Sequence, residues 1–220
     1  MTDEAGALVR KVADGYWIKH QINLIEERIF TQLKMQLDGR IDYVGEVAAH
    51  FDRLILLLVR FLAIRVDGDG TRFAYLRRIE AGNAPGEDTL QHDLWEFLSC
   101  SEYPEAERKH VSAGRADVYI PQGRFRFVIE VKRSLGTWTE GALDGLLRQT
   151  TAYQQTDVRI GVLAILDLSD RPAGVPHFDD CFMVRERSVS ATDNRCAVVM
   201  RVPANRRTPS DQAQVAARES

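Results

Sequence analysis

Two carboxylates and one ammonium group lie close together in the sequence and are the residues best suited to chemistry. Asp117 belongs to the segment 114–120, in which apolar residues alternate with others, while Glu130 and Lys132 belong to the more apolar segment 127–133. Both patterns are typical of β-strands. Side chains two residues apart on a strand point to the same face, so we expect Glu130 and Lys132 to share one face of a sheet.

The turn between the two strands decides whether Asp117 joins this pair. A two-residue turn at Gln122 and Gly123 predicts a hairpin in which Asp117 lies opposite Val128 and diagonal to Glu130, on the same face. A slip of one residue in the register would move Asp117 to the other face. The expected cluster of charges therefore depends on the geometry of the turn.

Such a cluster favours a metal-dependent reaction. Charges on one sheet face are costly to bury unless something offsets them, and a hard divalent cation with oxygen ligands would do so. Lys132 is not a ligand while it is protonated. Beside a metal it would instead hold or polarise an attacking water, or stabilise charge that develops on a phosphate.

The order of these residues resembles the core of the PD-(D/E)XK nuclease superfamily, which has the restriction-endonuclease-like fold. Asp117 is followed by Glu130-Val131-Lys132 on the next strand. An acid-led helix at Glu87-Asp88-Thr89-Leu90, a strand, the hairpin and a further helix stand in the family's order. That last helix carries Gln149-Thr150-Thr151-Ala152-Tyr153, which resembles the Q-x-x-x-Y element of RecB-like members. The resemblance covers roughly residues 85 to 203.

The resemblance implies a set of roles for these residues. Asp117 and Glu130 would hold Mg²⁺, or Mn²⁺ as a substitute, together with the Val131 carbonyl, and Lys132 would assist the attacking water. The family's acid often follows a proline, whereas here it follows Gly-Arg-Ala, a departure that many members tolerate. Taken alone, a Glu-x-Lys pair also fits a solvated strand face, and it is the ordered set that favours the nuclease interpretation.

Two helices would complete the site in this interpretation. Gln149 and Tyr153 are four residues apart and so lie on one helix face, where they would position the substrate; ordinary surface polar residues have the same spacing. The leading helix would supply an acid that completes or orients the metal site. We favour Glu87, because it begins the helix, over the other acids of that helix: Asp88, Asp93 and Glu96.

Composition places the chain among soluble globular proteins. It has 220 residues, 45% hydrophobic and 28% charged, with a net charge of −3, which gives no overall basic character. Three isolated cysteines without C-x-x-C spacing argue against a disulfide framework and a zinc site and favour a reducing cytoplasm. No signal peptide is evident, and the apolar run 54–64 is too short to span a bilayer, so no membrane partner is expected.

The first eighty residues lie outside the resemblance and predict a helical hairpin. Apolar residues at helical spacing from about Glu4 to Leu37 predict a long helix, either continuous or interrupted near Gly15, that ends at Asp38-Gly39-Arg40. A second helix from about Asp42 would face inward with Val44, Val47, Ala48, Phe51, Leu54, Ile55, Leu58 and Leu62. Such stripes are usually plain core, so a role of this hairpin in homodimerisation or in docking a protein partner is a hypothesis.

These patterns together predict an α/β protein with a restriction-endonuclease-like mixed central sheet flanked by helices. The expected parts are the hairpin at 1–80, a nuclease-like domain at 85–203 and a polar, disordered tail at 204–220. The nearly continuous apolar run 159–168 predicts a central strand covered on both faces. Two further strands are expected at 181–184 and 197–202.

The function expected from the sequence is metal-dependent hydrolysis of phosphodiester bonds in DNA, by an endonuclease active in restriction, repair or phage defence. The alternative is a non-catalytic DNA-binding or scaffold subunit of a larger complex. A third interpretation makes the hairpin an assembly element, with a nuclease part that acts only when a partner is engaged.

Overall fold

The computed structural model describes residues 23–67, 72–77, 83–103, 105–111, 115–136, 139–153, 158–170, 177–191 and 193–206. For residues 108–111, 115–117, 140 and 149–153 the description covers the backbone only. The helices are α2 (Leu24–Leu37), α3 (Gly45–Asp67), α4 (Glu87–Cys100) and α5 (Glu140–Tyr153), with 3₁₀ turns at Ala74–Leu76 and Phe178–Cys181. The strands are β1 (Glu107–Val111), β2 (Arg115–Gln122), β3 (Phe125–Ser134), β4 (Ile160–Asp167), β5 (Phe182–Ser188) and β6 (Asn194–Pro203).

The six strands form one mixed sheet in the order β1-β2-β3-β4-β6-β5. The first three are an antiparallel meander, β3, β4 and β6 run parallel, and β5 returns antiparallel to β6. Parallel neighbours need a crossover connection, and α5 provides it between β3 and β4. The expected α/β class, mixed sheet and flanking helices are therefore confirmed.

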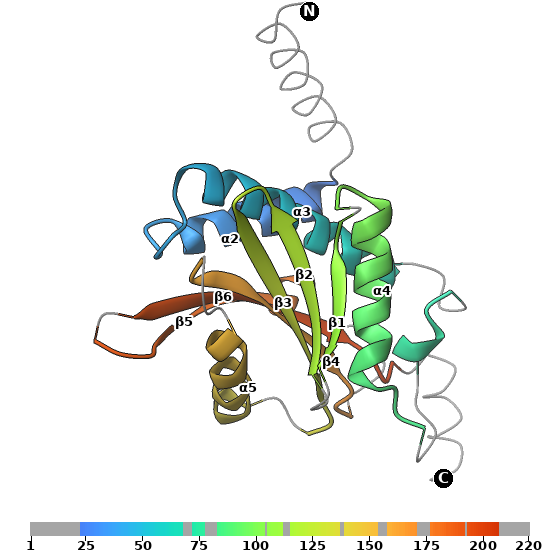
Figure 1. Ribbon diagram of the computed structural model, residues 1–220. Coiled ribbons are helices and arrows are strands. Elements are labelled where there is room, and N and C mark those ends of the chain that lie inside the picture. The colour runs from blue at the N-terminus through green and yellow to red at the C-terminus, as the bar shows by residue number, and fades with distance from the viewer. Residues whose placement is uncertain are drawn as a thin grey trace, which may run out of the picture.

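Helices cover both faces of this sheet (Figure 1). Residues of α2, α3 and α4 pack with Val118, Ile129, Val131 and their neighbours in a large core. On the other face, Leu143 and Leu147 of α5 pack against β4 and β6 in a smaller cluster. Alternate residues of β3 and β4 consequently face different helices, because side chains alternate along a strand.

The turn of the β2–β3 hairpin lies one residue later than expected. Gln122 pairs with Phe125, so the turn consists of Gly123 and Arg124. Gly123 has φ +57°, which a residue without a Cβ adopts at low cost and which is typical of the first position of a type II′ hairpin turn. The predicted pairing of Asp117 with Val128 is therefore wrong: Asp117 lies directly opposite Glu130.

The first described helix is shorter than the predicted segment 4–37. Asn23 is extended, and its side chain accepts a hydrogen bond of 2.8 Å from the Glu26 backbone N–H, so it is an N-cap and α2 begins at Leu24. The prediction of a single helix that continues through residue 23 is therefore wrong. Residues 1–22 lie outside the described residues. The predicted stop is confirmed, since Gly39 adopts φ +73° just after the helix.

The predicted helical hairpin is present and shares its core with the sheet. The hairpin contributes Ile29, Leu33 and Leu37 of α2, together with Phe51, Leu54, Ile55, Leu58 and Leu62 of α3, to the same core as the strands. Val44, expected to face inward, is 69% exposed, because it precedes α3. Much of the apolar stripe considered for dimerisation is therefore buried within the protein itself. A homodimer or a docked protein partner stays a prediction. Light scattering of the purified protein tests the dimer.

The remaining strand predictions are confirmed. Every residue of β4 is buried, as expected for a central strand, and β5 and β6 contain the predicted segments 181–184 and 197–202 almost entirely. The predicted tail was wrong at its start, because Arg206 donates to the Val66 and Arg65 carbonyl oxygens; residues 207–220 lie outside the described residues. None of the described helices is both long enough and apolar enough to cross a lipid bilayer.

Candidate functional site

Glu130 and Lys132 form a buried ion pair on the α5 face of the sheet. Glu130 has no exposed surface, Lys132 is 5% exposed, and the Lys132 ammonium contacts the Glu130 carboxylate directly. Ile129 and Val131 belong to the core on the opposite face. The strand alternation expected from the sequence therefore brings the acid and the base together.

The hairpin register adds a second acid to this pair. Asp117 pairs with Glu130 and is flanked on its other side by Lys109 of β1. Residues directly opposite each other in an antiparallel pair belong to the same face and have Cβ atoms about 5 Å apart. Position 117 is thus closer to Glu130 than the diagonal placement expected from the sequence. The side chain of Asp117 lies outside the described residues.

Glu87 lies at the end of the strand that carries this pair. Its carboxylate accepts a hydrogen bond of 3.1 Å from the backbone N–H of Arg133, the residue after Lys132. Gly86 is the N-cap of α4, so Glu87 is the first residue of that helix, where a carboxylate is favoured by the helix dipole. The acid chosen from its place at the helix start is therefore held against the strand that carries Lys132.

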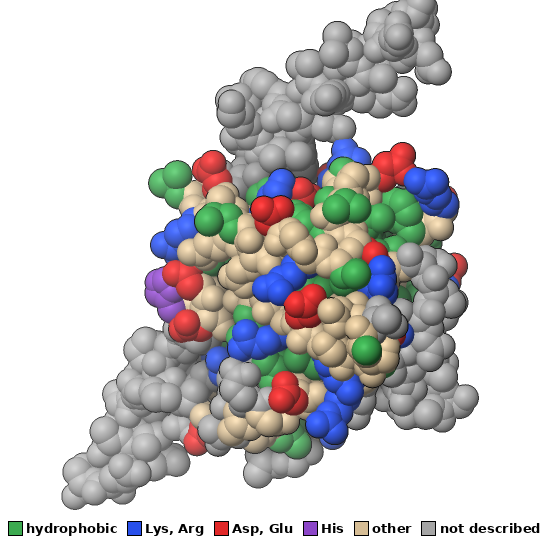
Figure 2. Space-filling view, turned by 90° about the vertical axis from the view of Figure 1, so that its left-hand side faces the viewer, with side chains coloured by type: hydrophobic (Ala, Val, Ile, Leu, Met, Phe, Trp, Pro, Cys, Tyr) green, Lys and Arg blue, Asp and Glu red, His purple; other side chains and the backbone are tan. Residues whose placement is uncertain are grey.

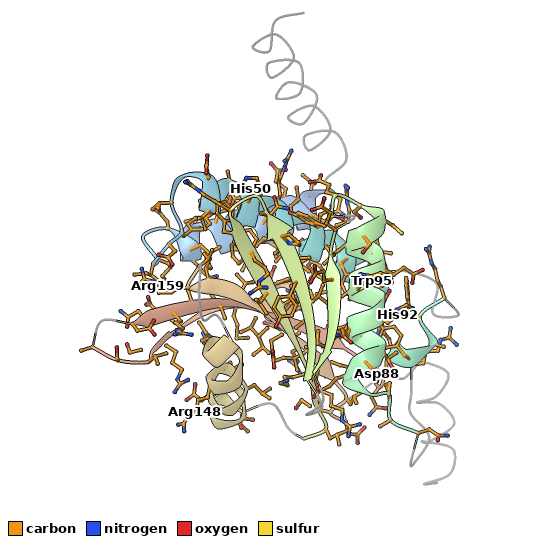
Figure 3. The ribbon with its side chains drawn as sticks, in the orientation of Figure 1. His50, Asp88, His92, Trp95, Arg148 and Arg159 are labelled. Carbon is orange, nitrogen blue, oxygen red and sulfur yellow. The ribbon has the colours of Figure 1, made fainter. Side chains whose placement is uncertain are left out.

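The other acids of α4 have different surroundings. Asp93 binds Arg65 of α3 through hydrogen bonds of 2.5 and 2.9 Å and accepts a third, of 2.5 Å, from Tyr75. Asp88 and Glu96 are exposed. Figure 3 shows Asp88 at the start of α4, with His92 and Trp95 further along it. Of these four acids, Glu87 is the one with a described contact to β3.

Tyr75 illustrates the electrostatics of the Asp93 cluster, which lies away from the ion pair. Burial raises the pKa of Tyr75 well above its usual value of 10.0, and the neighbouring Asp93 carboxylate raises it further. A cavity of about 540 Å³ lies between α3, the 3₁₀ turn 74–76 and α4, and its lining includes Tyr75, Arg65, Asp93 and Glu96. Leu90, Leu94 and Leu98 place α4 on the sheet face opposite Glu130. This cavity is therefore a separate feature of the molecule.

Helix α5 lies over the same sheet face as the ion pair. Leu143 and Leu147 pack on Leu163 and Ile165, which are the β4 neighbours of Glu130 and Lys132. Thr139 begins the helix as expected, since its hydroxyl accepts a hydrogen bond of 3.2 Å from the Ala142 N–H. Gln149 and Tyr153 belong to the last turns of α5; their side chains lie outside the described residues, and their role stays a prediction.

Sequence reasoning missed a second buried charge pair on this face. Asp167, at the end of β4, is fully buried and forms an ion pair with Arg201 of β6. It also accepts hydrogen bonds from the Ser169 N–H at 3.0 Å and the Ser169 hydroxyl at 2.6 Å. Ile165 stands between Lys132 and Arg201 in the strand register. The signal was present, because Asp167 is the acid that closes an apolar parallel strand, and sites lie at the carboxyl ends of such strands.

Charges of both signs are mixed elsewhere on the surface. Figure 2 shows the side that carries the α2–α3 turn and the β5–β6 hairpin, where acidic and basic side chains are interspersed. Several of them are paired there, including Arg40 with Glu186 and Arg195 with Asp193. Among the described side chains of this side, the two signs of charge therefore alternate and form no single positive field of the kind that coats nucleic acid.

Carboxylates on this sheet face are the candidate ligands for a metal ion. Among the described residues, no three His, Cys, Asp or Glu side chains stand close enough to hold an ion. The side chain of Asp117, which the register places opposite Glu130, lies outside the described residues. Asp117 and Glu130 carry two negative charges and Lys109 and Lys132 carry two positive ones, so the group has no net charge; its two carboxylates are oxygen ligands of the kind that a divalent cation prefers.

Comparison with known proteins gave no match to a family model, a curated protein or a solved structure. Any functional conclusion therefore depends on the residues and geometry described above.

Proposed function

We propose that this protein is a Mg²⁺-dependent nuclease that hydrolyses phosphodiester bonds in DNA. The observation that carries the proposal is the convergence of Asp117, Glu130 and Lys132 on one sheet face, with Asp117 directly opposite Glu130 and Lys132 in contact with it. Burying charges in this way is costly, and packing explains only the apolar residues around them. Catalysis would account for the cost.

The arrangement of elements supports the proposal. An acid-led helix, three antiparallel strands, a helix and a parallel strand follow one another as α4-β1-β2-β3-α5-β4. This is the order in which the sequence resembles the PD-(D/E)XK nucleases, and we propose that the sheet is of the restriction-endonuclease-like type. The helices α2 and α3 stand before it and would fix the oligomeric state or dock a partner.

The residues fit a bound Mg²⁺ in chemical type. Asp117, Glu130 and the Val131 carbonyl would hold it, with Mn²⁺ as a substitute, because hard divalent cations prefer oxygen ligands. Glu87 would complete or orient the site from the end of β3. When bound, the ion would stabilise negative charge on the phosphoryl group and on the leaving oxygen.

Side chains of the protein would hold the attacking water and position the substrate. Lys132 would leave its ion pair with Glu130 to hold the attacking water and to stabilise charge on the phosphate. Its burial strengthens that effect, because a charge acts more strongly where water is excluded. Gln149 and Tyr153, at the end of α5 on the same face, would position the substrate.

The ion pair also favours a second candidate, a non-catalytic DNA-binding or scaffold subunit. In the described geometry Lys132 already neutralises Glu130. A sheet that only supported a larger complex would be satisfied by this pairing and would need no metal. Calorimetric titration with Mg²⁺ separates the two, since the nuclease binds the ion and the scaffold does not.

The first prediction concerns cleavage. Purified protein should cut supercoiled or linear DNA in Mg²⁺ or Mn²⁺ and not in EDTA, and Lys132→Ala should lower the rate at least about a hundredfold, the usual effect of losing one group that stabilises charge in the transition state. Product patterns on gels would show whether the cuts are internal.

The matched control is Lys34→Ala. Lys34 also pairs with a carboxylate, Asp52 at 2.7 Å, but it lies on α2 at the surface, so cutting should persist. Circular dichroism separates lost chemistry from lost folding, and Glu130→Gln, which keeps the side-chain shape, provides a second test. Undiminished cutting by folded Lys132→Ala would remove this mechanism.

A further inference from the structure

An arginine and a tyrosine stand together on the sheet face that carries Glu130 and Lys132. Arg126 precedes Glu130 by four residues on β3, so it belongs to the same face. Tyr119, opposite Val128 and two residues from Asp117 on β2, belongs to it as well. The Arg126 guanidinium carbon lies 4.8 Å from the centre of the Tyr119 ring. The pair therefore stands in line with the proposed active site, on the side nearer the hairpin turn.

The chemistry of this pair suits an oxyanion. Arg126 is exposed and Tyr119 is half-buried. A guanidinium that stacks on an aromatic ring is held by cation–π attraction and has its N–H groups around its edge. Those N–H groups can donate two parallel hydrogen bonds to a phosphate. A ring that fixes the guanidinium also lowers the entropy lost when the phosphate binds.

The distance from the active site fits a strand of nucleic acid. Four residues of a β-strand span about 14 Å, which equals about four phosphates measured along the axis of a B-form strand. A backbone that crossed the sheet face from Glu130 toward the turn would thus present a phosphate near Arg126.

We propose that Arg126, held in place by Tyr119, binds a backbone phosphate of the nucleic acid strand whose scissile phosphate lies at Glu130 and Lys132. The inference rests on the proposed function and adds the direction in which the strand lies, along β3 toward the β2–β3 turn. Such a contact fixes position and carries no base preference.

The chain offers a matched control for this arginine. Arg124 lies two residues away, in the turn, and has the same charge. It pairs at 3.0 Å with Glu46 of α3, and the two side chains are 82% and 69% exposed. Because α3 packs on the opposite face of the sheet, Arg124 points away from the proposed strand path. Arg124→Ala and Arg126→Ala therefore remove the same charge from two faces of one hairpin.

The experiment measures binding apart from cleavage. Fluorescence anisotropy of a labelled short DNA duplex would be recorded over a range of salt concentrations, with Ca²⁺ in place of Mg²⁺ to limit turnover. We expect Arg126→Ala to weaken binding about tenfold, as for one charge-assisted contact. The slope of log affinity against log salt should fall by about 0.9. Arg124→Ala should leave both quantities near those of the unaltered protein.

Two further comparisons test direct contact. Replacing single phosphates of the duplex by uncharged methylphosphonates should weaken binding at one position for the unaltered protein and not for Arg126→Ala. Tyr119→Phe, which keeps the ring, should retain affinity, whereas Tyr119→Leu should lose part of it while the protein stays folded by circular dichroism.

These measurements distinguish a failure of the proposed phosphate contact from a failure of the proposed nuclease function. Equal affinities and slopes for Arg124→Ala and Arg126→Ala, with DNA bound and cut, would overturn the phosphate contact and leave the nuclease intact. Failure of the unaltered protein to bind DNA at all would overturn both.

Discussion

Buried charges are the feature of single residues that most needs a physical reason in this protein. Lys132 and Glu130 lie on β3 beside the buried strand β4, and replacing such a pair by apolar residues is often neutral or stabilising. Arg65 and Asp93 form another largely buried pair, with side chains 5% and 17% exposed. The second pair has an evident structural use, since it ties α3 to α4, and the first has the use proposed above.

Arg65 gives a prediction about stability. Its guanidinium carbon lies 3.6 Å from the centre of the Phe61 ring and 4.8 Å from that of Phe73. Asp93→Ala would leave this buried cation without its acid, so the free energy of unfolding should fall by about 3 kcal/mol. Glu96→Ala, one turn later on the exposed side, should change it by less than about 0.5 kcal/mol. Urea unfolding of both variants checks this, and equal effects would contradict the structural role given to Asp93.

At the scale of elements, Asp42 attaches the α2–α3 turn to the sheet, together with Arg40, which pairs with Glu186 of β5. Asp42 accepts three hydrogen bonds from Arg159 at the start of β4: from the backbone N–H at 2.8 Å, from Nε at 3.1 Å and from Nη2 at 2.9 Å. Figure 3 shows Arg159 at this end of the sheet. Asp42 also has φ +61°, a conformation that aspartate and asparagine tolerate better than most residues. Asp42 thus contributes both to the conformation of the turn and to its attachment to the sheet.

This double role predicts graded effects of substitution. Asp42→Ala removes the acceptors and adds backbone strain, and should lower the free energy of unfolding by about 2 kcal/mol. Asp42→Gly removes the acceptors without the strain, and Asp42→Asn keeps the conformation and part of the hydrogen bonding, so both should cost less. Urea unfolding gives the order, and an alanine variant as stable as the asparagine variant would contradict this account.

The same acid predicts a pH dependence. Hydrogen bonds from Arg159 lower the pKa of Asp42 below its usual value of 3.8. A carboxyl whose pKa is depressed on folding contributes stability above the unfolded pKa and loses it as the pH falls through the folded one. The difference in stability between the protein and Asp42→Asn should therefore be constant above about pH 5 and shrink below 3.8. A difference that grew on acidification would refute the assignment.

At the scale of the whole molecule, the helical hairpin and the sheet form one core. Phe51 of α3 and Phe127 of β3 have ring centres 5.2 Å apart. His50 packs edge-on against Phe125 beside the β2–β3 turn, at 5.5 Å between ring centres. The domain boundary that the sequence suggests near residue 85 therefore separates two segments of the chain whose side chains pack in the same core.

Truncation tests this unity. A fragment of residues 83–220 would expose the apolar surface that α3 covers, so we expect it to lack a cooperative unfolding transition. Adding residues 1–82 as a separate fragment should restore the transition, because both halves of the core are then present. Circular dichroism during heating measures this, and a fragment 83–220 that unfolds cooperatively by itself would show that the two parts are independent domains.

Most helices and strands, and the local placement of the candidate site, could be predicted from residue order alone. Periodicity 2 placed Glu130 and Lys132 on one strand face, and the apolar run ending at Leu168 identified the central strand β4, because local side-chain alternation follows directly from residue order. The place of Glu87 at the start of its helix was also readable, from the break at Pro85 and Gly86.

The way in which these elements meet could not be predicted from residue order. The hairpin turn lies at Gly123 and Arg124, one residue later than predicted, so Asp117 lies opposite Glu130. Helix α2 begins after the N-cap Asn23, whereas apolar periodicity predicted a helix that continued through this residue. The pairing of Asp167 with Arg201, and the packing of α3 on the sheet, join residues far apart in the chain. Such contacts depend on strand order and on the competition of all faces for burial, which no local pattern records.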